Sequence, residues 1–110
     1  MDSYSRRKRQ HDADVVLVTE ALNTLAEDCS AVLDASGVTG ERGDCSRCPV
    51  AAYVAAFLGR HSIDDVELDV GEFNGVLVSS QGLSTFLALP QEVREFIEDF
   101  DNGAYPELCS

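Results

Sequence analysis

The sequence predicts an α+β fold with two N-terminal helices, a three-stranded antiparallel meander and a C-terminal helix. Three patterns support this fold. Apolar residues first recur at helical spacing, then alternate with polar residues between glycine-containing turns, and return to helical spacing after a proline. Because a chain of 110 residues supports one core, we expect a single α+β domain at residues 12–110 behind a basic, flexible arm at residues 1–11.

The first predicted helix begins at Asp12 or Asp14 and carries a long apolar seam. The seam consists of Val15, Val18, Leu22, Leu25, Cys29 and Val32, and its steps of three and four residues are typical of an α-helix. We expect the seam to pack inside the domain. The alternative is a homodimer in which the helix at residues 12–36 pairs with its copy; otherwise the protein is a monomer. The preceding arm shows no periodicity and is expected to be mobile.

A second, almost wholly apolar helix is expected from Pro49 to about Arg60. Proline suits the first helical position, with Cys48 as the cap. Because nearly every position is apolar, this helix needs cover on more than one side. Replacing Phe57 with alanine should therefore cost about 3–5 kcal/mol. The predicted core consists of Val15, Leu22, Leu25, Val54, Phe57, Val66, Leu68, Phe96 and Phe100.

The second half of the chain predicts a meander followed by a helix. Strands are expected at residues 65–70, 76–80 and 83–89, with hairpin turns at residues 71–75 and 81–82. Pro90 begins the last helix, whose apolar residues fall on one face, and Asn102 and Gly103 end it.

Charge is distributed unevenly along the chain. The formal net charge is −12, yet four of the eight basic residues lie within residues 1–11. The acidic body repels phosphate backbones, so we expect it not to bind nucleic acid directly. It favours a basic protein partner, although the charge can also serve solubility alone. Two groups that could form one patch are expected to bind such a partner: Asp65, Glu67 and Asp69 on the first strand, and Glu92, Glu95, Glu98 and Asp99 on the last helix.

The sequence lacks the motifs that mark several functional classes. No apolar run is long enough to span a bilayer, and the N-terminal region lacks the apolar segment of a secretory signal. We therefore expect a cytoplasmic protein without membrane contact. The sequence also lacks a glycine-rich phosphate loop after a strand, a nucleophile elbow and a His-Glu zinc motif, so we expect no enzymatic activity.

Cys45 and Cys48 form a C-x-x-C pair directly before the apolar helix. Such a pair serves as a redox couple, as half of a zinc site or as half of an iron–sulfur site. A metal would need two further ligands. Cys29 and Cys109 are the sulfur candidates, with His11 and His61 in reserve. The alternatives are structural thiols, a metal or cluster site, and a disulfide or redox pair; in the cytoplasm thiols are normally reduced.

The segment Cys45-Ser-Arg-Cys48-Pro49-Val50 resembles the C-x-x-C-P-V segment of the WhiB-like iron–sulfur regulators of actinobacteria. The resemblance implies a four-cysteine cluster with Cys29 as the upstream ligand, whereas Val54 stands where the family has its last cysteine. Residues 48–53, 89–96 and 100–108 are similar to small acidic proteins of actinobacteria or their phages. That likeness implies no activity.

Two hypotheses about function follow from these observations. The first is a non-enzymatic acidic interaction module without a cofactor, such as an adaptor, an inhibitor or a phage or plasmid accessory factor, that binds a basic surface. The second is a metal-binding or redox-sensing regulator that uses Cys45 and Cys48 to hold zinc or an iron–sulfur cluster.

Overall fold

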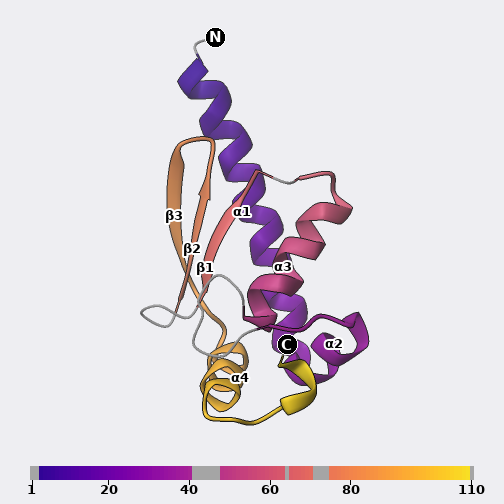
Figure 1. Cartoon of the computed structure of the whole chain (residues 1–110). Coiled ribbons are helices and arrows are strands. Elements are labelled where there is room, and N and C mark those ends of the chain that lie inside the picture. Colours follow the sequence, from indigo (N-terminus) through magenta and orange to yellow (C-terminus); the bar gives the residue numbers. More distant parts are fainter. Residues whose placement is uncertain (1–2, 41–47, 64, 71–74, 110) are drawn as a thin grey trace.

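A computed structural model of the chain describes residues 3–40, 48–63, 65–70 and 75–109 (Figure 1). The strands form an antiparallel sheet in the order β1-β2-β3, so the α+β class, the meander and the C-terminal helix are confirmed. The elements in chain order are α1 (Ser3–Glu27), α2 (Cys29–Ser36), α3 (Pro49–Arg60), β1 (Glu67–Val70), β2 (Gly75–Ser80), β3 (Leu83–Ala88), α4 (Gln91–Asp101) and the 3-10 helix η2 (Pro106–Leu108).

The first helix differs from its prediction at both ends. α1 begins at Ser3, so residues 3–11, expected to belong to a flexible arm, form its first turns. At the other end Asp28 interrupts the predicted helix with φ −165° and ψ 88°, and its carboxylate accepts a hydrogen bond from the Ala31 amide at 3.4 Å. Asp28 thereby caps α2. Among the described residues, three helices rather than two precede the sheet.

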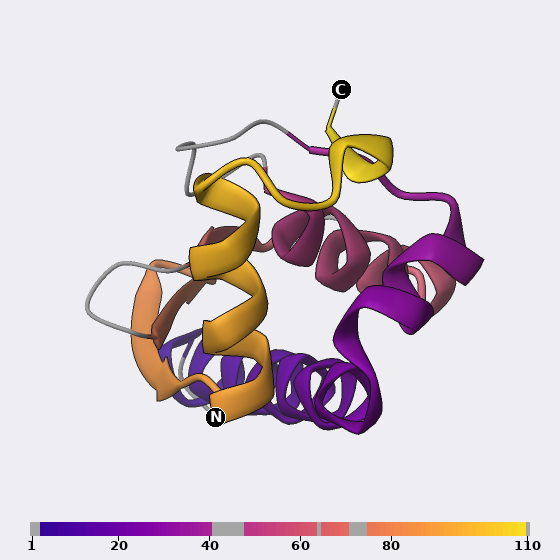
Figure 2. The ribbon, with the colours of Figure 1, turned by 90° about the horizontal axis from the view of Figure 1, so that it is seen from below.

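The helices cover one face of the sheet (Figures 1 and 2). α1 packs against β2 and β3, while α3 packs against α1 and β1. α4 contacts α1 and α2 at one end of the sheet, where the chain returns towards its N-terminal half. The core therefore lies between the helices and the inner sheet face.

The core contains most of the residues that were predicted for it. Phe57 is a partial exception, because it packs against the core and remains partly exposed. Its ring lies 5.2 Å from that of His61, and the Arg60 guanidinium lies 5.5 Å from the ring centre. The cost of about 3–5 kcal/mol predicted for Phe57→Ala is therefore too high, since that range applies to fully buried rings. Buried as predicted are Leu22, Leu25, Val54, Leu68, Phe96 and Phe100; Val15 and Val66 are partly buried like Phe57.

The turn between β2 and β3 forms where it was predicted. Ser80 pairs with Leu83, so the loop has two residues, Gln81 and Gly82. Their φ values are +54° and +74°, which match the right-handed twist of a tight hairpin. The other predicted turn, at residues 71–75, falls outside the described residues except for Gly75.

Candidate interaction sites

Acidic residues from two parts of the chain line one groove. Glu92, Glu95 and Asp99 lie on one side of α4, at the spacing that places side chains on a common helix face. Glu27 and Asp28 reach the same groove from the junction of α1 and α2. The groove has a volume of ≈ 300 Å³, and none of the described residues that line it is lysine or arginine. We call these five residues the acidic groove.

Local hydrogen bonds hold part of the acidic groove in place. Asp28 accepts from the first turn of α2, where the helix dipole favours a negative charge. On α4, the Gln91 amide donates to Glu95 Oε1 at 3.0 Å. These bonds involve neutral donors, so they leave the negative charges of both carboxylates uncompensated.

The predicted partner-binding acids divide among different surfaces. Glu92, Glu95 and Asp99 line the acidic groove, and Glu98 is exposed on the same helix. Glu67 and Asp69 line a separate groove of ≈ 470 Å³ between β1 and α3. Asp65 lies in a third groove, described below. The two predicted groups thus line different grooves.

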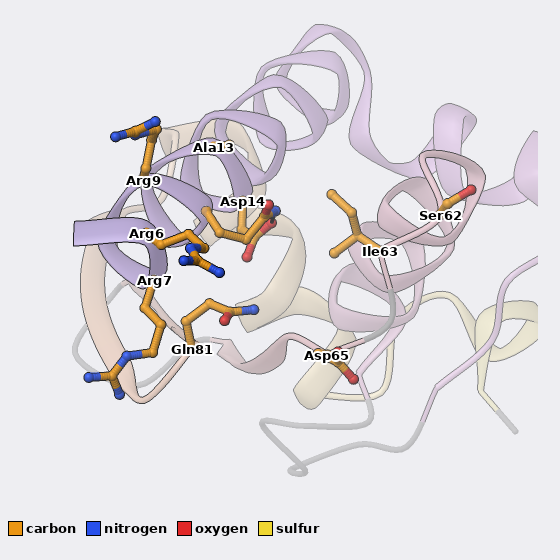
Figure 3. Close-up of a pocket in the computed structure, with 10 residues that line it drawn as sticks. Arg6, Arg7, Arg9, Ala13, Asp14, Ser62, Ile63, Asp65 and Gln81 are labelled. Carbon is orange, nitrogen blue, oxygen red and sulfur yellow. Dashed lines mark hydrogen bonds between the residues drawn. The ribbon is translucent and has the colours of Figure 1, made fainter. Parts of the chain in front are cut away.

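The arginines near the start of α1 line the largest of these grooves, with a volume of ≈ 690 Å³. Arg6, Arg7 and Arg9 form one wall; the other contains the segment after α3, with Ser62, Ile63 and Asp65, and Gln81 of the hairpin turn (Figure 3).

Acidic side chains sit close to these arginines. Asp14 lies 1% exposed on the inner side of the groove and accepts a hydrogen bond from the Gln10 amide at 2.9 Å. Lys8 points elsewhere and pairs with Asp12 at 3.0 Å; this hydrogen bond and the charge of Asp12 raise the pKa of Lys8. Because Asp14 and Asp65 contribute negative charge, the groove has mixed character.

His11, expected in the flexible arm, is buried between α1 and the hairpin. Its Nδ1 lies 2.8 Å from Ser80 Oγ on β2, and its Nε2 lies 2.7 Å from Thr85 Oγ1 on β3. Each ring nitrogen can donate to its hydroxyl partner or accept from it, depending on the tautomer. With both nitrogens engaged by hydroxyl groups, His11 links α1 to the sheet.

Each described cysteine lies at an end of a helix: Cys29 begins α2, Cys48 precedes α3 and Cys109 follows η2. Cys29 and Cys48 are buried and Cys109 is partly exposed, and all three are thiols. Cys48 Sγ accepts a hydrogen bond from the Ala51 amide at 3.4 Å and caps α3 as predicted. Near Cys109, the Gly40 amide donates to the Leu108 carbonyl at 2.9 Å.

The environment of Cys29 disfavours its thiolate. Burial, followed by the nearby charges of Asp28 and Cys48, raises the pKa of Cys29 to about 12. Redox attack uses the thiolate, so a high pKa lowers the reactivity of Cys29 as a nucleophile. Cys45 lies outside the described residues, and the C-x-x-C pair therefore stays a prediction. Within the described part of the chain, no group of three His, Cys, Asp or Glu side chains could hold a metal ion. His61 is exposed at the end of α3.

Comparison with known proteins gives no relative: no protein-family model, no curated protein and no solved structure matches the chain. In the residues that the structure describes, no helix is both long and apolar enough to cross a membrane.

Proposed function

We propose that this protein is a non-enzymatic interaction module whose acidic surface binds a basic region of another protein, as an adaptor, inhibitor or accessory factor does. The acidic groove supports this proposal most directly. Five carboxylates from α1, α4 and Asp28 face one depression whose described lining contains no lysine or arginine. Such an arrangement raises the negative potential of the groove above that of isolated surface acids.

The chemistry of the groove indicates the class of partner. Arginine and lysine side chains would offset the repulsion among the five carboxylates, and charge-assisted hydrogen bonds to them are stronger than neutral ones. A nucleic acid would instead add negative charge to a protein of net charge −12. Lysine- or arginine-rich protein segments are therefore the proposed ligands, and their attraction speeds association at low salt.

The test uses an oligo-arginine peptide as the probe. The combined variant Glu92→Lys, Glu95→Lys and Asp99→Lys should weaken binding by about 10-fold or more, equivalent to about 1.4 kcal/mol. It should also reduce the dependence of affinity on salt, because fewer ion pairs form. Isothermal titration calorimetry at several salt concentrations measures both effects.

A charge-matched control separates the groove from net charge. The variant Glu20→Lys, Asp34→Lys and Glu107→Lys changes the same number of exposed acids outside the groove. It should retain most of the affinity. Equal losses in the two variants would show that only total charge matters, and unchanged affinity in the α4 variant would contradict the proposal.

A cysteine-based regulator is the second candidate. The observation in its favour is that Cys48, a member of the predicted C-x-x-C pair, lies close enough to Cys29 to contribute to the raised pKa of that thiol. Anaerobic purification followed by an ultraviolet–visible spectrum and by zinc, iron and thiol analysis distinguishes the candidates. Stoichiometric metal, or unfolding of the Cys45→Ser, Cys48→Ser variant, would favour the regulator.

A further inference from the structure

The outer face of the sheet carries a pair of exposed apolar side chains on two adjacent strands. Leu77 on β2 and Phe86 on β3 are direct cross-strand neighbours and are 37% and 51% exposed. Val76 and Val78, which alternate with Leu77 along β2, are fully buried on the opposite face. The described helices α1 and α3 pack on that inner face and leave the outer one uncovered (Figures 1 and 2).

The strand register defines what surrounds this pair. Asp69 on β1 is the neighbour of Leu77, and Glu67 lies two residues away on the same strand face. The other outer positions of β2 and β3 carry small residues, and the Ser79 and Ser84 hydroxyls bond each other at 3.0 Å. The outer face thus consists of the rows Asp69-Leu77-Phe86, Glu67-Ser79-Ser84 and Gly75-Ala88.

Gly75 allows Phe86 to lie flat on the sheet. A Cβ atom at Gly75 would collide with Cζ of Phe86 and would lie only 2.7 Å from the Leu87 carbonyl oxygen. The ring therefore covers the backbone of β2 where a larger residue would displace it.

We propose that the outer sheet face, defined as the three rows above, binds an amphipathic helix with a basic flank. Its apolar stripe would lie on Leu77 and Phe86, and its lysine or arginine side chains would face Glu67 and Asp69. This inference rests on the proposed function, because the ligand is again a basic region of a partner protein, and it adds a second site with an apolar anchor.

Charge and shape favour this occupant. Both acids stand on the β1 side of the apolar pair, and within the described residues neither forms an ion pair. Three strands spaced about 4.8 Å apart give a sheet about 10 Å wide, which matches the diameter of one α-helix. The small residues around the pair allow a helix to approach closely. Since one helix on three strands buries a small area, the interaction belongs to the weak, transient class.

A peptide titration tests this site on the full chain. The probe is a helical peptide of leucine and lysine with one apolar face, and its control has the same composition in scrambled order. Nuclear magnetic resonance titration should show shifts at the outer-face residues for the first peptide alone. Leu77→Ser with Phe86→Ser should raise Kd about 10-fold or more. Val16→Ser, which removes a 57% exposed apolar residue of α1, should leave Kd unchanged.

A second variant tests the two acidic residues beside the apolar pair and leaves Leu77 and Phe86 unchanged. Glu67→Gln with Asp69→Asn should weaken binding at low salt and flatten the salt dependence. Circular dichroism and urea unfolding establish that each variant is folded. Because all four altered residues are exposed, their replacement should leave the core intact.

The outcomes separate this inference from the proposed function. Equal Kd for the Leu77, Phe86 variant and the wild type, equal binding of the scrambled peptide, or shifts confined to the acidic groove would overturn the sheet-face site. If oligo-arginine still bound the acidic groove in that case, the proposed function would stand without this inference. If instead oligo-arginine did not bind the acidic groove while the helical peptide still bound the outer sheet face, the sheet-face site would stand and the acidic groove would lose its proposed role.

Discussion

Cys29 shows how one buried side chain links stability to pH. Its folded pKa of about 12 lies above its ordinary value of 9.0, chiefly because burial penalises the thiolate and secondarily because of Asp28 and Cys48. Between these two values the folded chain holds the Cys29 proton while the unfolded chain releases it. The contribution of this proton to stability is complete below pH 9.0 and is lost as pH rises towards 12.

We therefore expect the stability advantage of wild type over Cys29→Ala to shrink as pH rises above 9.0. The loss can reach about 1.4 kcal/mol for each unit of pKa difference. Urea unfolding of both proteins across this pH range measures it, and the alanine variant controls for the titration of all other groups. Stability curves that stay parallel would contradict the raised pKa.

Predictions about single residues succeeded where neighbouring positions in the sequence carried the signal. Cys29 continues the apolar seam, and its spacing alone indicated a buried small side chain. His11 was missed because its neighbours in sequence are polar and its partners, Ser80 and Thr85, lie 69 and 74 residues away. Glu27 and Asp28 were missed as groove residues for the same reason, since only tertiary packing brings them to α4.

At the scale of elements, the hydrogen bonds of His11 fasten α1 to the hairpin. His11→Ala would leave the Ser80 hydroxyl, which is 4% exposed, without this partner. An unsatisfied buried polar group costs about 1–3 kcal/mol, so urea unfolding should show a loss of that size. A double-mutant cycle with Ser80→Ala isolates the contact between His11 and Ser80, because Ser80→Ala removes the hydroxyl that His11→Ala leaves without a partner.

We expect the combined His11→Ala, Ser80→Ala variant to be more stable than the sum of the single losses implies. Strictly additive losses would show that the two side chains do not stabilise each other. Val16→Ala is a suitable control on the same helix, since Val16 is exposed and should change the free energy of unfolding little.

The elements themselves were predictable to different degrees. The start of α3 at Pro49 and the alternation in the strands are short-range signals. α3 begins at Pro49 as predicted, and all three strands formed, although β1 begins at Glu67 rather than at residue 65. The boundary between α1 and α2 was hidden because the apolar spacing continues across Asp28, although aspartate is a favoured N-cap residue. The first turns of α1 carry arginines without apolar periodicity, so no burial signal marked them as helical.

At the scale of the whole molecule, the arginines of α1 and the acidic groove lie towards opposite ends (Figure 1). The protein measures 49 × 27 × 23 Å. The arginines of α1 lie near the end at which the chain begins, and α4 with its acids lies near the other (Figure 1). With a net charge of −12, repulsion among the acids opposes the compact state.

We expect the melting temperature to rise when sodium chloride is added, because salt reduces the Debye length to about 10 Å at 0.1 M and screens this repulsion. The variant Glu92→Gln, Glu95→Gln and Asp99→Asn should melt higher at low salt and gain less from added salt. Differential scanning fluorimetry measures both proteins. A melting temperature that falls with salt would show that attraction between the two ends outweighs repulsion.

The position of α1 also bears on how the chain acquires its fold during synthesis. α1 contacts α2, α3, α4, β2 and β3, and all of these partners are made after it. Its apolar seam and His11 therefore leave the ribosome before the residues that cover them, and the hairpin that receives His11 emerges late in translation. The apolar residues of α1 therefore stay uncovered until the later elements have been made, and the native core assembles only once the sheet has been synthesised.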